Sequence, residues 1–133
     1  MSKQERPKLS DRVQRGDFVF SRPARDQTFT DVFPTVASLK VHVVEHTSDG
    51  RERPYYYTDT SFSAAVDCSN PKCYGGGAWL QYDVHDMVRE RRTDGVFHHA
   101  CKGYEGSPKG HRRHGPCHHH FDVTVHIEYK PEP

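Results

Sequence analysis

Two stretches of the chain alternate between apolar and polar residues, the period of a strand with one buried face. The first spans residues 36–46, with apolar positions at Ala37, Leu39, Val41 and Val43. The second has apolar positions at Phe121, Val123, Val125, Ile127 and Tyr129. Both stretches are therefore predicted to form half-buried strands, and the second is the clearest strand in the sequence.

Residues 55–67 are predicted to form another strand, paired with the first. Alternate positions share one face, at Tyr56, Thr58, Thr60, Phe62, Ala64 and Val66. The turn sequence Ser48-Asp49-Gly50 precedes this stretch, so the two strands are expected to form an antiparallel hairpin. A further short strand is predicted from Gly95 to Cys101.

A helix is predicted between the glycine run at 75–77 and the strand at 95–101. Val84, Met87 and Val88 form an apolar stripe at helical spacing. Asp83 is expected to cap its N-terminus, and Gly95 to end it. The order is then ββαββ.

This order predicts an α+β fold with one helix and a small mixed four-stranded sheet. A β–α–β crossover would make the strands at 55–67 and 95–101 parallel. Residues 1–35 show no persistent period and are predicted to be an extended or partly disordered arm. Residues 36–130 would form the domain, and residues 131–133 a C-terminal tail.

The composition indicates that this fold needs a covalent or metal cross-link to be stable. Only 33% of the 133 residues are hydrophobic, and the mean hydropathy is −0.93. Small domains with thin cores are usually held by disulfides or a metal. The chain has four cysteines, placed at or near the ends of the predicted strands: Cys68, Cys73, Cys101 and Cys117.

Four thiolates match a closed tetrahedral zinc site, which leaves no open position for catalysis. The sequence therefore predicts structural Zn²⁺. Glycines 75–77 would let backbone N–H groups approach the sulfur atoms. Three alternatives stay open: two disulfides in any of three pairings, iron in place of zinc, or a histidine in place of one cysteine. The candidate histidines are His98, His99, His118, His119 and His120.

The N-terminus lacks the apolar region of a secretory signal, and no apolar run reaches the ~18 residues of a membrane helix. These features predict a cytoplasmic protein with reduced thiols and no membrane span. The formal net charge is +1, which gives no global electrostatic case for binding nucleic acid.

Two segments are candidate binding surfaces. Residues 102–120 are expected to form a long basic loop that contacts nucleic acid or an acidic protein partner through Lys102, Lys109, Arg112 and Arg113. The arm carries candidate partner-anchoring aromatics at Phe18, Phe20, Phe29 and Phe33. A competing hypothesis is that residues 18–20 pair with the sheet edge and the arm is part of the fold.

Residues 62–129 resemble a group of small uncharacterised bacterial proteins with a zinc-ribbon-like pattern. The pattern is Cys-Pro-Asn-x-x-Cys-x-Gly-Gly-Gly, a helix, Cys-x-Gly, and a last cysteine before a terminal strand. The matching residues are Cys68, Asn70, Cys73, Gly75, Gly76, Gly77, Cys101, Gly103 and Cys117. Ser69 departs from the usual proline. The resemblance supports the four-cysteine site and implies no activity.

The sequence thus favours a non-enzymatic zinc-binding protein, an accessory or adaptor in a bacterial cytoplasmic assembly. A protein partner is expected, and no small-molecule substrate is inferred. A nucleic-acid-binding zinc protein is the alternative. A metallohydrolase is a more distant one, because four cysteines would fill the metal's coordination shell.

Overall fold

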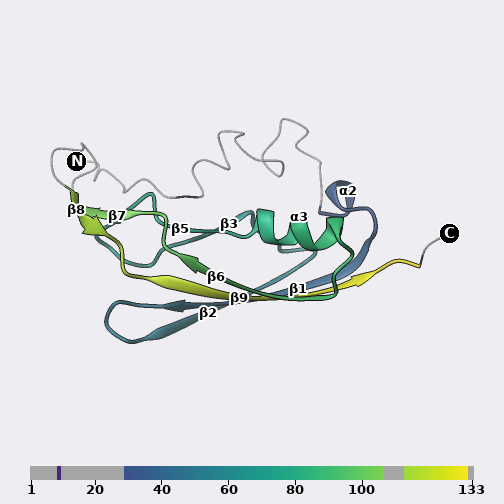
Figure 1. Cartoon of the computed structure of the whole chain (residues 1–133), viewed down its shortest axis with the longest axis horizontal. Coiled ribbons are helices and arrows are strands. Elements are labelled where there is room, and N and C mark those ends of the chain that lie inside the picture. The colour runs from purple at the N-terminus through teal and green to yellow at the C-terminus, as the bar shows by residue number, and fades with distance from the viewer. Residues whose placement is uncertain (1–8, 10–28, 107–112, 132–133) are drawn as a thin grey trace.

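The computed structural model describes residue 9, residues 29–106 and residues 113–131 (Figure 1). Most of the described elements are strands. In chain order they are α2 (Phe29–Val32), β1 (Val36–His46), β2 (Glu52–Thr58), β3 (Ala65–Asp67), β4 (Cys73–Tyr74), β5 (Gly77–Trp79), α3 (Gln81–Arg89), β6 (Asp94–Ala100), β7 (Tyr104–Gly106), β8 (Arg113–Pro116) and β9 (His120–Tyr129).

The largest sheet has four strands in the order β2-β1-β9-β6, and every neighbouring pair is antiparallel. Alternation in β1 and β9 gives this sheet one buried face, as predicted from their sequences: Leu39, Val41, Val43, Phe121, Val123, Val125 and Ile127 are all at most 2% exposed. One position differs from the expectation. The register shifts between Val36 and Ser38, so Val36 is buried and Ala37 is exposed.

The predicted mixed sheet with ββαββ order is wrong. Residues 55–67 do not form one strand, because β2 ends at Thr58. There the Ser61 hydroxyl oxygen accepts a hydrogen bond from the Thr58 N–H, and the Ser61 N–H donates one to the Thr58 carbonyl. Side-chain bonds of this kind offer the backbone an alternative to a sheet ladder. Residues beyond the turn form β3, which pairs antiparallel with β5 in a separate two-stranded sheet. The expected parallel pair is therefore absent from the described residues.

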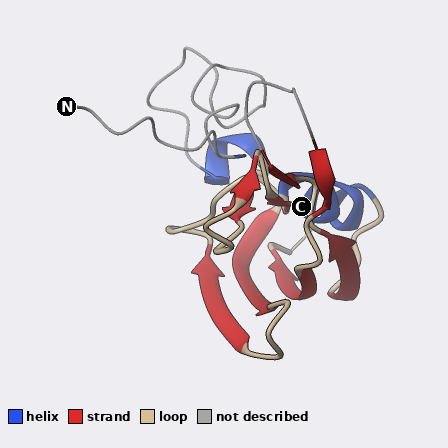
Figure 2. Ribbon diagram, turned by 90° about the vertical axis from the view of Figure 1, so that its left-hand side faces the viewer, coloured by secondary structure: helices blue, strands red, loops and turns tan. Residues whose placement is uncertain are grey.

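The predicted long loop at 102–120 is also partly wrong. Its described part contains β7 and β8, which pair antiparallel, and β7 pairs with β4 to complete a three-stranded sheet. Figure 1 shows the short strands, α3 and α2 on one side of the four-stranded sheet. A second view shows the long strands as a curved layer with the helices to one side (Figure 2). The core lies between these layers.

The helix differs from its prediction at both ends. Leu80, not Asp83, occupies the N-cap position and makes no side-chain cap bond. Asp83 lies inside the first turn, where it is buried and bonds to His99 of β6 at 2.6 Å. After Arg89 the chain turns through Arg91, whose φ of 50° is left-handed. Gly95 is already part of β6.

Two of the proposed partner anchors belong to the core of the chain itself. Phe29 and Phe33 are 6% and 5% exposed, and their ring centroids are 5.0 Å apart. The Phe29 ring also contacts Phe62 at 5.4 Å. Their assignment as exposed anchors is therefore wrong in this structure. Phe18 and Phe20 lie outside the described residues.

None of the described helices is long and apolar enough to cross a membrane.

Candidate metal centre

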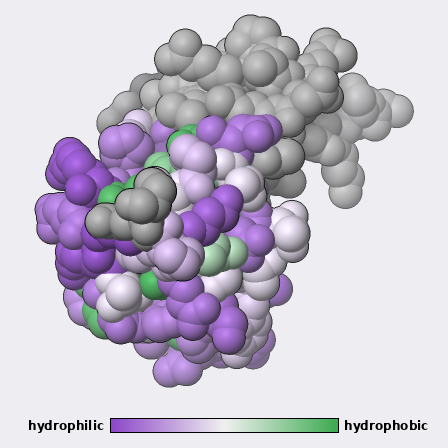
Figure 3. All heavy atoms as spheres, turned by 90° about the vertical axis from the view of Figure 1, so that its right-hand side faces the viewer, coloured by the Kyte–Doolittle hydropathy of each residue, from purple (hydrophilic) through white to green (hydrophobic). Residues whose placement is uncertain are grey.

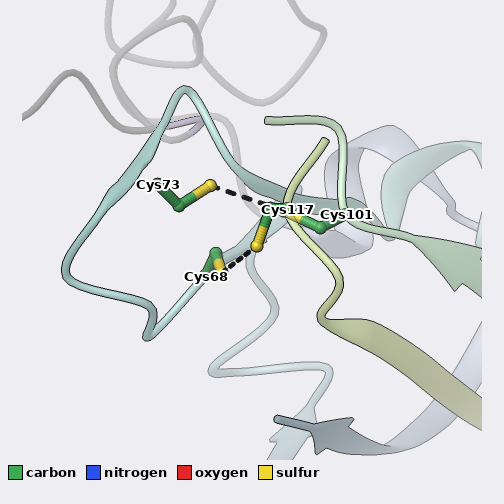
Figure 4. Close-up of side chains that lie close together, drawn as sticks. All are labelled: Cys68, Cys73, Cys101 and Cys117. Atoms are coloured by element: carbon green, nitrogen blue, oxygen red, sulfur yellow. Dashed lines mark hydrogen bonds between the residues drawn. The ribbon is translucent and has the colours of Figure 1, made fainter. Parts of the chain in front are cut away.

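The four cysteines come from four different places in the fold and meet at one end of it (Figure 4). Cys68 follows β3, Cys73 begins β4, Cys101 follows β6 and Cys117 lies between β8 and β9. All four are buried, and their sulfur atoms lie within 4.8 Å of one another. The parallel crossover expected from the sequence is absent from the described residues, and two small antiparallel sheets help to bring the cysteines together instead.

The spacing of the sulfur atoms fits four ligands around one ion. Cys68 Sγ lies 3.6 Å from Cys117 Sγ, and Cys73 Sγ lies 3.6 Å from Cys101 Sγ. Tetrahedral coordination with zinc–sulfur bonds of about 2.3 Å places the sulfurs about 3.8 Å apart. A disulfide would need about 2.05 Å, and all four cysteines are free. The structure therefore holds four thiols that could bind a metal ion, not two disulfides.

Two glycines allow the backbone to come this close to the sulfur atoms. A Cβ at Gly76 would overlap Cys73 Sγ and would lie 2.7 Å from Cys101 Sγ. A Cβ at Gly103 would lie 2.5 Å from Cys73 Sγ and 2.6 Å from the Cα of Gly76. Both positions are therefore closed to any larger residue unless the sulfur atoms move, and at Gly103 the neighbouring backbone must move as well.

Backbone and side-chain N–H groups point at the sulfur atoms, as expected for thiolates. Cys101 Sγ accepts from the N–H groups of Gly77 and Gly103, at 3.2 and 3.4 Å. Asn70 donates its N–H to Cys68 Sγ and its side-chain amide to Cys117 Sγ, each at 3.4 Å. These donors stabilise negative charge on sulfur.

The thiols also shift one another's pKa. A hydrogen bond from Cys68, with help from the backbone N–H groups of Gly103 and Gly77, lowers the pKa of Cys101 to about 5. The same bond, and then burial, raises the pKa of Cys68. Burial, and then the charge on Cys101, raises the pKa of Cys73. The protein alone favours a thiolate at Cys101 and opposes one at Cys68 and Cys73, and a bound cation would remove that opposition.

A buried ionic network borders the cysteines. Glu45 is 0% exposed, and its Oε2 atom lies 2.6 Å from Nδ1 of His119. Oε2 also accepts from the N–H and hydroxyl of Ser69, at 3.0 and 2.9 Å, and Oε1 accepts from the Tyr55 hydroxyl at 2.8 Å. Burial would raise the pKa of Glu45, but these hydrogen bonds together lower it. Glu45 is therefore a carboxylate that fixes both His119 and the residue next to Cys68.

Sequence reasoning missed Glu45, although a signal was present. Glu45 continues the alternation of Leu39, Val41 and Val43, so it occupies an inward position of β1. His119 likewise extends the buried alternation that begins at Phe121. A charged residue in register with a buried face indicates a partner inside the protein.

Among the described residues, only one of the five candidate histidines belongs to a group of side chains that could hold a metal. His119 forms such a group with Glu45 and Cys68. The other four lie elsewhere: His98 pairs with Asp122, His99 pairs with Asp83, His120 stacks on His46, and His118 is exposed.

The structure describes only part of the basic cluster. Lys102 is exposed directly after Cys101. Arg113 begins β8. Lys109 and Arg112 lie outside the described residues. Of the four predicted binding residues, the structure thus describes the side chain of Lys102 alone.

Comparisons with known proteins identify no relative. No protein-family model matches the chain, and no curated protein or solved structure is significantly similar to it. Fold and site together define a mostly β protein with four clustered cysteines that could bind a metal ion.

Proposed function

We propose that the four cysteines hold one structural zinc ion and that the protein is a non-enzymatic binding protein. The observation that carries the proposal is the closed set of four buried thiols, with sulfur atoms 3.6 Å apart in two pairs. Four thiolates complete the shell of a tetrahedral ion. The close packing of Gly76 and Gly103 on the sulfurs supports a site without an open position.

Zinc is favoured over other ions because tetrahedral all-sulfur sites select zinc or iron. Zinc needs no redox partner and is the usual ion of structural four-cysteine sites. Elemental analysis of the freshly purified chain tests this, and one tightly held zinc per chain is the expected result. Iron in the same amount would contradict zinc, and a folded chain without metal would contradict both.

Cobalt substitution tests the ligand set independently. Tetrahedral cobalt with four thiolates absorbs strongly in the visible range, and its charge-transfer bands scale with the number of sulfur ligands. Cys117→Ser should reduce these bands, whereas His119→Gln should preserve them. If both variants kept the full sulfur bands, or if only His119→Gln lost them, the four-cysteine assignment would be contradicted.

We further propose that the protein serves as an accessory or adaptor in a bacterial cytoplasmic assembly, with the basic segment around Lys102 as a contact. Lys102 is exposed and adjacent to a metal ligand, so the metal would hold its position. Figure 3 shows the face of the molecule on the α2 side in Figure 1, which is mainly hydrophilic with small isolated apolar areas.

A pull-down with the zinc-loaded chain tests this role. Lys102→Ala combined with Arg113→Ala should weaken partner capture, and Lys130→Ala, an exposed lysine near the C-terminus, serves as the control. Equal capture by all three proteins would contradict the assigned surface. Binding of RNA or DNA with a steep salt dependence would instead support the nucleic-acid alternative.

A further inference from the structure

A cavity separate from the sulfur cluster opens between the β1–β2 turn and the loop that follows Cys68. It has a volume of about 350 Å³. The β1–β2 turn, the loop after Cys68 and the segment before β9 supply its lining, which is Thr47, Ser48, Asp49, Arg51, Arg53, Ser69, Asn70, Pro71 and His119. This volume lies within the usual range for small-molecule sites, which is about 300–1,000 Å³.

One wall of the cavity is rigid and polar. His119 is 5% exposed, and its Nδ1 is held by Glu45 at 2.6 Å. Its other nitrogen, Nε2, lies 3.5 Å from the hydroxyl oxygen of Ser48, which also lines the cavity. The Ser69 hydroxyl donates to Glu45 and is therefore fixed as well. Glu45 accepts four hydrogen bonds, which stabilise its negative charge behind this wall.

The lining also carries two permanent positive charges. These belong to Arg51 and Arg53, which both line the cavity. The carboxylate Asp49 also lines it, but that charge is already paired with Arg51 Nε at 3.3 Å and bonded by the Thr47 hydroxyl. Among the described residues, Arg53 makes no ion pair. An excess of positive charge therefore faces the cavity.

We propose that this cavity binds a small organic phosphate, with its phosphate group held by Arg51, Arg53 and the Ser48 hydroxyl. Guanidinium groups pair with phosphate oxygens through two parallel hydrogen bonds. They keep their charge at every physiological pH. The volume exceeds what a phosphate group alone fills, which leaves space for an organic part.

A different use of the same residues is less favoured. Ser48, His119 and Glu45 follow the order nucleophile, base and orienting acid of a serine hydrolase. The distance of 3.5 Å between Ser48 Oγ and His119 Nε2 exceeds that of a strong hydrogen bond. The two arginines in the lining favour the binding of an anion.

Titration of the full, metal-loaded chain with phenyl phosphate tests the proposal. Binding is followed by calorimetry and amide NMR shifts at constant ionic strength, with inorganic phosphate as a second probe. We expect saturable binding, shifts at residues 47–53, 69–71 and 119, and tighter binding of phenyl phosphate than of inorganic phosphate. Shifts confined to other residues, or no saturable binding, would overturn the proposal.

Matched variants separate the site from overall charge. Arg53→Gln is expected to weaken phenyl phosphate binding about tenfold, since a hydrogen bond to a charged group contributes about that factor. Arg89→Gln removes the same charge from α3, where Arg89 pairs with Asp86 at 3.1 Å, and should leave binding unchanged. Melting temperature and metal content verify that both variants are folded. Equal weakening in the two variants would assign binding to general charge and overturn the site.

Discussion

The four-stranded sheet and the cysteine end are built in opposite ways. β1 and β9 have 11 and 10 residues, and each buries every second side chain over most of its length. At the cysteine end, β3 and β5 have three residues each and β4 has two. Long strands bury enough apolar surface to stabilise themselves, whereas strands of two or three residues do not.

The difference shows where the metal would matter most. Ordering a residue costs about 1–2 kcal/mol of backbone entropy, and the short strands have little apolar surface to offset it. Structural zinc contributes of order 10 kcal/mol near neutral pH. The cysteines also belong to the same buried cluster as the sheet residues. We therefore expect the loss of the metal to destabilise the whole chain, beginning at the cysteine end.

The largest expected effect is that of removing one ligand. Cys73→Ser should abolish stoichiometric metal binding and leave an unfolded or aggregating chain, a loss of order 10 kcal/mol. Lys72→Ser is the matched control, because Lys72 is exposed and bonds to Asn70 through its backbone N–H, which serine retains. Metal content and circular dichroism measure the outcome. A folded, metal-loaded Cys73→Ser protein would refute the role of this cysteine.

A new charged side chain should destabilise the four-stranded sheet on its buried face and leave its open face almost unaffected. Val125 is 1% exposed and Thr124 is exposed. Val125→Asp buries an unpaired charge and should destabilise the fold by more than about 3 kcal/mol. Thr124→Asp should change stability by less than about 1 kcal/mol. Thermal melts compare the two variants, and equal destabilisation would show that both faces of β9 are buried.

A smaller effect is expected at the glycines of the cysteine end. Gly76→Ala forces a Cβ onto the sulfurs of Cys73 and Cys101 and should cost about 1–3 kcal/mol, together with metal affinity. Gly75 has a φ of 66° but nothing within 4 Å of an added Cβ. Gly75→Ala should therefore cost only backbone strain, about 1 kcal/mol, and leave metal affinity intact. Chelator competition measures the affinity of each variant, and similar losses would contradict close packing on sulfur.

The smallest effect concerns the open face of the sheet. A hydrogen bond between His126 and Asp94 raises the pKa of His126 above 6.5 and lowers the pKa of Asp94 below 3.8. The pair therefore stabilises the fold when His126 is protonated and Asp94 is ionised. This stability is lost as pH rises through the raised pKa of His126, or falls through the lowered pKa of Asp94.

His126→Gln should accordingly lower the melting temperature more at about pH 5.5 than at about pH 8.5. Asp94→Asn provides the control: Glu128 remains 3.6 Å from His126 in that background, so His126→Gln should show a smaller difference there. Both side chains are solvent-exposed, so the effect is expected to be small. An equal effect of His126→Gln at both pH values would show that the pair does not contribute.

The sequence alone determined those parts of the molecule that leave a pattern within a short stretch of residues. Strict alternation identified β1 and β9 because a period of two reports which side chains face the core. The cysteines were recognised from their number and chemistry. The buried position of Glu45 was also readable, since it continues the alternation of Val41 and Val43.

Only the tertiary structure decided which strands pair. Alternation says that a strand has a buried face but does not name its neighbour, so the place of β9 between β1 and β6 was not predictable from pattern. Strands of two or three residues such as β4 carry no period at all. The Glu45–His119 bond joins residues 74 positions apart. The site around this bond forms only because the folded chain brings the two buried side chains together. Long-range pairing of this kind is a property of the packed fold, and no local stretch of sequence contains it.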